Sequence, residues 1–195
     1  MTRADVVIVG GAATGCAAAY FLCAQQPGLR VQVLEVDPSY QWCATTRSVA
    51  SIRHQFSTPE NIRMSMFGTE FLRRIGEHLA VDGEVPEVGF VERGYLFLAT
   101  DAGLTTLQAN HAVQRGCGAE VALLDRAALQ GRFPWLATAD LAGGALGLAG
   151  EGWLDAYALM MAFRHKARAL GAAFEPARAV GIDRQGERVT AVALA

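Results

Sequence analysis

Residues 6–15 read VVIVGGAATG, and this stretch decides the fold. Its first four residues form a continuous β-branched run, which is typical of a strand buried on both faces, as in a parallel sheet. The glycine-rich turn leads into an Ala-rich segment, residues 16–25, which favours a helix that ends before Pro27. Residues 30–35 then alternate like a second strand. This part of the chain therefore predicts one βαβ unit with a right-handed crossover.

The turn has the spacing of a dinucleotide-binding fingerprint, at Gly10, position 12 and Gly15. Gly10 allows a tight turn, Gly15 allows close contact between helix and strand, and the helix N-terminus favours a pyrophosphate. Ala12 departs from the pattern, because its methyl group lies where the pyrophosphate normally meets bare backbone, and Gly11 relieves this only in part. Glu35 follows at a strand end, where a carboxylate accepts ribose hydroxyls and argues against a 2′-phosphate. The fingerprint alone does not separate FAD from NAD.

Residues 38–57 show no period and predict a long loop, which in a compact domain is usually functional. Hydroxyl donors and cations are concentrated there, directly after the ribose-binding strand, and could clamp a phosphate and a bound anion. They include Thr45, Thr46, Arg47, Ser48, Ser51, Arg53 and His54. A nicotinamide domain more typically continues into its next βαβ unit, so this loop favours FAD. A lone loop histidine is usually structural, and we interpret His54 in that way.

The rest of the chain no longer repeats the βαβ pattern. The sequence predicts an amphipathic helix over 59–80 with Thr58 as N-cap, a strand within 90–100, a helix over 102–115, a strand near 120–124, a helix capped by Asp155, and two strands joined by a turn at 183–186. The break in pattern predicts a second domain inserted into the first. The expected boundaries are the first part of the cofactor-binding domain at 1–83, the inserted domain at 84–149, and a return to the first domain at 150–195.

Composition limits the classes of function. The 195 residues are 52% hydrophobic and 18% charged, with 17 basic and 19 acidic side chains and no long run of one sign. These values predict a globular protein with a small-molecule ligand, and they show no charge pattern typical of a protein that binds nucleic acid or an anionic membrane.

The 4 cysteines form neither a CxxC pair nor a metal-binding cluster, so we expect reduced thiols, no metal and a cytoplasmic location. Asp5 and three glycines interrupt the apolar residues 4–24, so neither a membrane span nor a signal peptide is predicted.

Several longer stretches carry a resemblance to a known family. They are SVASIRHQFSTPENIRMSMFGTEFLRRI (48–75), RGYLFLAT (93–100), GRFPWL (131–136) and EGWLDAYAL (151–159). With the glycine turn, they resemble the superfamily of FAD-dependent amine oxidoreductases that includes D-amino-acid oxidase, glycine oxidase and sarcosine dehydrogenase. They look most like its branch of FAD-dependent oxidoreductase domains related to sarcosine and dimethylglycine dehydrogenases. The resemblance covers essentially the whole chain and implies a Rossmann-like α/β FAD-binding domain with an inserted α+β substrate domain.

The resemblance also implies roles for individual residues. It implies FAD held at Gly10, Gly11, Ala12, Gly15 and Glu35, with Thr46, Arg47 and Ser48 near the phosphates or flavin and Val180 offering backbone contacts to adenine. Arg53 matches the arginine that binds the substrate carboxylate in monomeric sarcosine oxidases, and its alternative is a structural ion pair with Glu60. Ala50-Ser51 stands where close relatives usually carry Gly-Gly. Cys43 is the only thiol to watch for flavin attachment or oxidation.

The expected function is FAD-dependent oxidation of the C–N bond of a small amino acid or secondary amine. Two alternatives stay open: a non-catalytic or assembly subunit that keeps the fold, and an NAD-dependent dehydrogenase. Family members continue well past Ala195, so we expect a C-terminally truncated fold, either a fragment or a short form completed by a second polypeptide. Residues 1–195 alone are therefore expected to be inactive.

Overall fold

The computed structural model describes residues 3–195, which form two compact units. The first unit holds the chain up to Val49 together with residues 75–88 and 155–195, and the second holds residues 50–74 and 89–154. The sequence prediction assigns residues 50–74 to the first domain, whereas the structure groups them with the second unit. The chain thus has an α/β unit interrupted by an α+β unit, and each is described below by itself.

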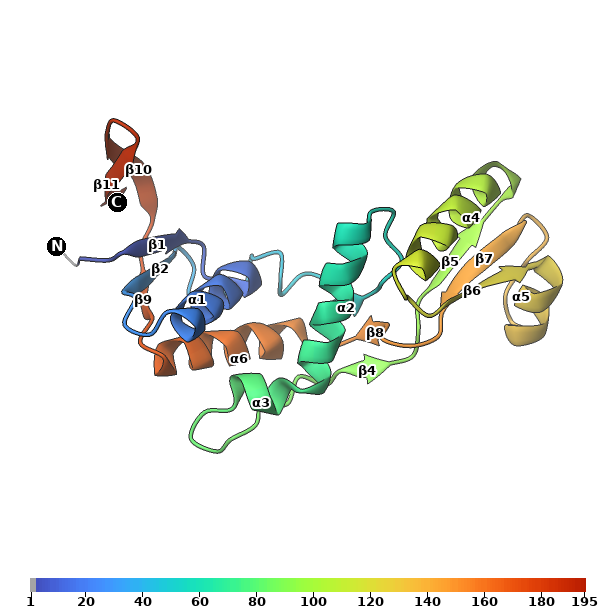
Figure 1. Cartoon of the computed structure of the whole chain (residues 1–195), viewed down its shortest axis with the longest axis horizontal. Helices are drawn as coiled ribbons and strands as arrows, with labels where there is room; N and C mark the ends of the chain where they lie inside the picture. The colour runs from blue at the N-terminus through green and yellow to red at the C-terminus, as the bar shows by residue number, and fades with distance from the viewer. Residues whose placement is uncertain (1–2) are drawn as a thin grey trace. The chain divides into compact units, whose positions relative to one another are not determined.

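The first unit contains the predicted βαβ motif. Strand β1 (Val6–Val9), helix α1 (Ala13–Gln25) and strand β2 (Val31–Glu35) follow one another, and the two strands pair in parallel with Val6 opposite Val31. Strand β9 (Ala173–Pro176) adds to the other side of β2, also in parallel, which gives the order β1-β2-β9 (Figure 1). The predicted βαβ unit is therefore confirmed.

Helix α6 (Ala156–Ala169) packs beside α1. The Asp155 side chain accepts a hydrogen bond from the N–H of Ala158 at 2.9 Å, which confirms the predicted N-cap. Cys16 and Met160, one from each helix, are fully buried, as expected for this apolar contact. Helix α3 (Ile75–Leu79) also contacts α6. The core of the unit therefore lies where α1, α6 and the sheet meet.

A hairpin of β10 (Ala179–Gln185) and β11 (Arg188–Leu194) follows β9. Its turn consists of Gly186 and Glu187, and Gly186 has a φ of +63°, a conformation that favours glycine. The predicted turn at 183–186 is therefore wrong in its bounds, because its first three residues continue the strand.

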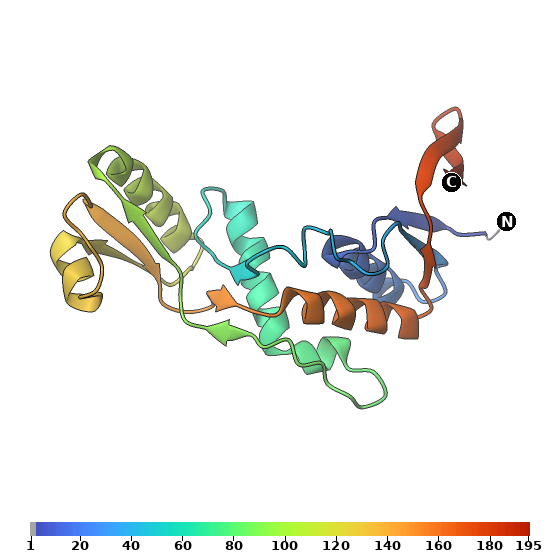
Figure 2. The same ribbon diagram turned by 180° about the vertical axis from the view of Figure 1, so that it is seen from behind.

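The second unit is built on an antiparallel sheet of β5 (Leu96–Ala99), β7 (Gly143–Gly147) and β6 (Val121–Asp125), with β7 in the centre (Figure 1, Figure 2). Helices α4 (Asp101–Gly116) and α5 (Arg126–Arg132) contact this sheet. Strand β7 was not predicted. Its sequence GGALG has little strand propensity, but small residues are needed there, since a Cβ atom at Gly144 would lie 2.8 Å from the carbonyl oxygen of Phe97.

A second, small antiparallel sheet contains β3 (Ser51–Ile52), β8 (Gly152–Trp153) and β4 (Val91–Glu92). The predicted loop at 38–57 thus includes a short strand. The predicted strand at 90–100 is two strands, because Gly94 between them has a φ of +81°.

The predicted helix at 59–80 is divided in the structure. Helix α2 (Pro59–Arg73) is followed by Arg74, whose φ of −110° and ψ of 27° leave the helical range, and α3 begins directly after Arg74. Of the predicted apolar stripe, Phe71 and Leu79 are buried but Phe67 is 59% exposed. The prediction of one continuous amphipathic helix is therefore wrong, because the pattern spans a break between the two units.

Candidate functional site

The glycine turn lies where β1, α1 and β2 come close together. Gly10 has a φ of +99°, so it makes the tight turn that the sequence predicts. A Cβ atom at Gly15 would lie 1.8 Å from the carbonyl oxygen of Gly10. Gly15 is therefore the residue that allows α1 to start against the end of β1. Ala12 has an extended backbone, with φ −75° and ψ −166°, so its conformation does not require glycine.

Glu35 ends β2 beside this turn. Its Oε2 accepts the N–H of Gly11 at 2.7 Å, and its Oε1 accepts the N–H of Asp37 at 2.9 Å. A carboxylate can accept about four hydrogen bonds, so both oxygens keep capacity for ribose hydroxyls. The structure thus brings together the predicted pyrophosphate turn and the predicted ribose acceptor.

The N-cap residue of helix α1 provides no side-chain hydrogen bond. This residue is Ala12, and the first turn of the helix contains no acidic residue. A helix N-terminus of this kind presents backbone N–H groups and the positive end of the helix dipole to an anion. The turn and the carboxylate of Glu35 therefore fit a dinucleotide whose pyrophosphate lies at α1.

The hydroxyl-rich loop contributes one side chain to this helix end. Thr45 Oγ1 accepts the N–H of Ala13 at 3.3 Å. The neighbouring Thr46 donates instead to the carbonyl oxygen of Tyr40 at 2.7 Å, and Ser48 Oγ donates to the carbonyl oxygen of Thr45 at 2.8 Å. Arg47 lies 4.1 Å from the centroid of the Trp42 ring. Of the predicted loop residues, Thr46, Arg47 and Ser48 thus stabilise the loop, and their contact with phosphate or flavin stays a prediction.

Val180 lies in β10 at an irregularity of the hairpin. The strand register shifts between Ala179, which pairs with Leu194, and Gly181, which pairs with Ala193. Val180 is the extra residue of this bulge, so among residues 3–195 no residue pairs with it across the hairpin. The contact between its backbone and adenine that the resemblance implies stays a prediction.

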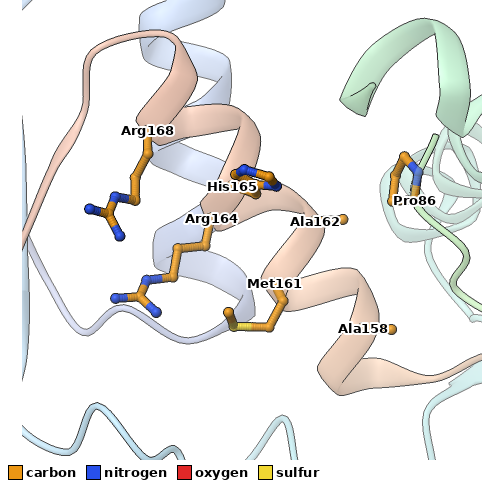
Figure 3. Close-up of a pocket in the computed structure, with 7 residues that line it drawn as sticks. All are labelled: Pro86, Ala158, Met161, Ala162, Arg164, His165 and Arg168. Atoms are coloured by element: carbon orange, nitrogen blue, oxygen red, sulfur yellow. The ribbon is translucent and has the colours of Figure 1, made fainter. Parts of the chain in front are cut away.

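Two residues beside Glu35 were not predicted. The Tyr40 side chain is 2% exposed, and its hydroxyl has no hydrogen-bond partner among the described residues. Arg164, on α6, lies 5.8 Å from the centroid of the Tyr40 ring and lines the same small pocket as Glu35. It also lines a cavity of about 390 Å³ along α6, where its guanidinium and that of Arg168 point away from Pro86 (Figure 3). Contacts formed across such sequence distances leave no local pattern that could have revealed them.

The thiols of this unit differ in their ionisation. Burial raises the pKa of Cys16 to about 12, so this thiol is unreactive at neutral pH. Burial also opposes ionisation of Cys43, but hydrogen bonds with Thr46 and Thr45 outweigh it and lower the pKa of Cys43. Cys43, the thiol singled out in the sequence, is therefore more easily ionised than Cys16.

Arg53, the predicted substrate-binding residue, belongs to the second unit and directly follows β3. Its Cζ lies 5.0 Å, 5.8 Å and 5.4 Å from the ring centroids of Phe56, Tyr95 and Phe97. In the part of the chain that the structure describes, it forms no ion pair, so the alternative pair with Glu60 is not seen. The half-buried guanidinium therefore keeps its charge available for an anion.

His54 follows Arg53 directly in the chain, and Ala50 precedes it in the same segment. His54 is 6% exposed, and its Nε2 lies 3.0 Å from Thr69 Oγ1. Since the Thr69 hydroxyl donates to the carbonyl oxygen of Gly150 at 2.8 Å, the imidazole must donate to Thr69, and burial lowers its pKa. These contacts agree with a structural role. Ala50 has a φ of +50°, so the backbone keeps a left-handed conformation that glycine would adopt with less strain.

Two classes of feature are absent from residues 3–195. These residues contain no group of three or more His, Cys, Asp or Glu side chains that could hold a metal ion. No helix among them is long and apolar enough to cross a bilayer.

Comparisons with known proteins match these observations. The family model described as FAD dependent oxidoreductase matches residues 5–195. The chain is 46% identical over 173 residues to FAD-dependent oxidoreductase domain-containing protein 1 of Xenopus laevis, covering 87% of this chain and 35% of that protein. It is 42% identical over 176 residues to the Bos taurus protein of the same name, covering 88% of this chain and 36% of that protein. The chain thus spans about a third of these relatives.

Solved structures show the same fold. The structure of L-proline dehydrogenase from P. horikoshii superposes with a TM-score of 0.82 at 23% identity, covering 98% of this chain and 49% of that one. Glycine oxidase from Geobacillus kaustophilus gives a TM-score of 0.75 at 26% identity, covering 94% and 49%. The chain therefore spans about half of each matched structure.

Proposed function

Because the chain belongs to the family of FAD-dependent oxidoreductases, we propose that it takes part in oxidising the C–N bond of a small amino acid or secondary amine. The family's cofactor is FAD, so the alternative of an NAD-dependent dehydrogenase is set aside. Bound FAD supplies the hydride acceptor, while the protein binds, orients and shields the reactants. The names of glycine oxidase and L-proline dehydrogenase support amino acids as the substrate class.

In this proposal, the first unit holds the cofactor. The amides at the start of α1 bind the pyrophosphate, and Glu35 accepts hydrogen bonds from the ribose hydroxyls. Gly10 and Gly15 keep the turn close to β1, and the backbone of Val180 contacts adenine.

The observation that supports the proposed activity is the environment of the Arg53 guanidinium. It is a half-buried cation whose Cζ lies 5.0–5.8 Å from three aromatic ring centroids and which forms no ion pair among residues 3–195. A planar guanidinium binds a carboxylate through two parallel hydrogen bonds, which fixes which C–H bond of the substrate is presented for transfer.

The experiment is an anaerobic titration of the purified flavoprotein, residues 1–195 joined to the remainder that the matched structures contain, with glycine, sarcosine and L-proline, monitored by bleaching of the flavin absorbance. We expect bleaching by at least one of these amines and strongly reduced bleaching in Arg53→Met. A matched control is Arg63→Met, an exposed arginine on α2 in the same unit. Bound flavin that no amine reduces would instead support the non-catalytic subunit, the alternative that Ala12 and Ala50-Ser51 suggest.

We also propose that residues 1–195 need further structure for turnover. Support comes from the matched structures, which are about twice the length that the chain covers. In the relatives this region and the remainder lie in one chain, so the comparisons give no support to a separate second polypeptide. The test compares amine-dependent flavin reduction by residues 1–195 alone and with the missing half supplied. Equal turnover in both would refute this proposal.

A further inference from the structure

We propose that Glu151 is a positioning residue that holds Arg53 in the geometry needed to bind a carboxylate. This inference rests on the proposed function of Arg53. Glu151 lies between β7 and β8 in the second unit, and neither its burial nor its partners were predicted from the sequence.

Glu151 is a carboxylate in an unusual position for an acidic residue. It is 1% exposed, and a Cβ atom at Gly147 would lie 1.7 Å from its Oε2, so strand β7 makes room for it with a glycine. Burial raises the pKa of Glu151, while hydrogen bonds and the positive charge of Arg53 counteract this in part. Among residues 3–195 this carboxylate forms no ion pair, and burial of an unpaired charge is costly unless hydrogen bonds stabilise it.

The hydrogen bonds of Glu151 fix the backbone that carries Arg53. Its Oε1 accepts the N–H of His54 at 2.6 Å, directly after Arg53 in the chain. On the other side, Ile52 pairs with Gly152, the residue next to Glu151. The carbonyl oxygen of Arg53 itself accepts a hydrogen bond from Ser65 Oγ at 2.5 Å. The peptide groups around Arg53 are thus held from both sides, with Glu151 as one of the holding groups.

The same carboxylate is linked to the aromatic surroundings of Arg53. Gln55 Nε2 donates to Glu151 Oε2 at 2.8 Å and to the carbonyl oxygen of Tyr95 at 2.8 Å. The carbonyl oxygen of Glu151 also accepts the N–H of Gly94 at 2.9 Å. Glu151 therefore connects the segment that bears Arg53 with the segment that bears one of its ring neighbours. We infer that it acts on substrate binding through Arg53, without touching the substrate.

The test observes Arg53 directly by NMR in the full chain. The Arg53 Nε–Hε signal is assigned by its loss in Arg53→Lys, and propionate is the carboxylate probe. In the wild type we expect a resolved signal that shifts with propionate. In Glu151→Gln we expect it to move to the position of disordered arginines, and propionate affinity to fall by about tenfold or more, as when one hydrogen bond of a bidentate pair is lost. Glu120→Gln, at an exposed carboxylate of the same unit, is the matched control.

The outcomes separate this inference from the proposed function. An unchanged Arg53 signal in folded Glu151→Gln overturns the inference, whatever propionate does. A signal that depends on Glu151, in a protein that does not bind propionate, supports the positioning role and contradicts the proposed role of Arg53. If Glu151→Gln does not fold, Gln55→Met removes the link to Tyr95 and keeps the carboxylate. In Gln55→Met the Arg53 Nε–Hε signal is expected to move part of the way toward the position of disordered arginines, and an unmoved signal overturns the inference.

Discussion

Replacing Gly15 with alanine adds one methyl group at the tightest contact of the cofactor turn. The new Cβ atom would lie 1.8 Å from the carbonyl oxygen of Gly10, whereas Cβ atoms essentially never approach other heavy atoms within 3.0 Å. The start of α1 must therefore separate from the end of β1 by about 1.2 Å, the difference between these distances. The carbonyl oxygen belongs to the backbone and the position of a Cβ atom is fixed by the backbone, so no side-chain rotation can relieve the contact.

The displacement affects both folding and cofactor binding. Overpacking of a closely packed contact costs typically about 1–3 kcal/mol, so we expect Gly15→Ala to lower the free energy of unfolding by at least that much. The amides at the start of α1 move with the helix, and geometric errors of about 1 Å can cost on the order of a hundredfold where function depends on precise placement. We expect a comparable loss of FAD affinity.

Two assays measure these effects. Thermal unfolding in the absence of FAD reports the stability loss, and a fluorescence titration with FAD reports the dissociation constant. Gly68→Ala is the matched control, because a Cβ atom at Gly68 meets nothing within 4 Å. Gly10→Ala distinguishes backbone strain from steric contact. Its Cβ atom would also meet no atom within 4 Å, whereas its φ of +99° is unfavourable for alanine. Wild-type FAD affinity and stability in Gly15→Ala would refute the reasoning.

Three further predictions concern single residues. Ala12→Gly should tighten FAD binding in the same titration, because it removes a methyl group from the approach of the pyrophosphate, and unchanged or weaker binding would show that the backbone already avoids Ala12. Asp155→Ala should lower the free energy of unfolding by about 1 kcal/mol in urea, since it removes the side-chain cap on the N–H of Ala158; an unaltered midpoint would contradict this. Burial lowers the pKa of His54 from its usual 6.5, so the unfolded chain takes up a proton that the folded chain does not, and stability should fall as pH falls through the usual value. In His54→Gln this part of the pH dependence of unfolding should disappear, and its persistence would assign it to other groups.

The parts of the fold that the sequence predicts correctly are those with local causes. β-branched residues make β1, the glycine turn requires a backbone that only glycine adopts easily at Gly10, and Asp155 caps α6 within a few residues. Strand β7 could not be predicted, because its glycines are explained by neighbours on β5 and β6. The periodic pattern that continues past Arg74 misled the prediction of a single helix, since periodicity does not reveal a change of backbone direction.

In the candidate site, too, the sequence predicts the residues whose position has a local cause and does not predict the others. Glu35 could be recognised because the distance along the chain from turn to carboxylate is a property of one βαβ unit. Tyr40, Arg164 and Glu151 could not, because their surroundings are assembled from segments that lie far apart in sequence. For Arg53, the sequence alone left both carboxylate binding and a structural ion pair with Glu60 open, and only the positions of the acidic side chains show that the ion pair is not formed among residues 3–195.

The pairing of β2 with β9 has a consequence for synthesis of the protein on the ribosome. The side chains of Gln32 and Glu175 are hydrogen-bonded although they are 143 positions apart in the chain. At about 5–20 residues per second, the first βαβ unit emerges several seconds before its neighbouring strand exists. During that interval the open edge of β2 is exposed to other nascent chains, while the intervening unit can already fold.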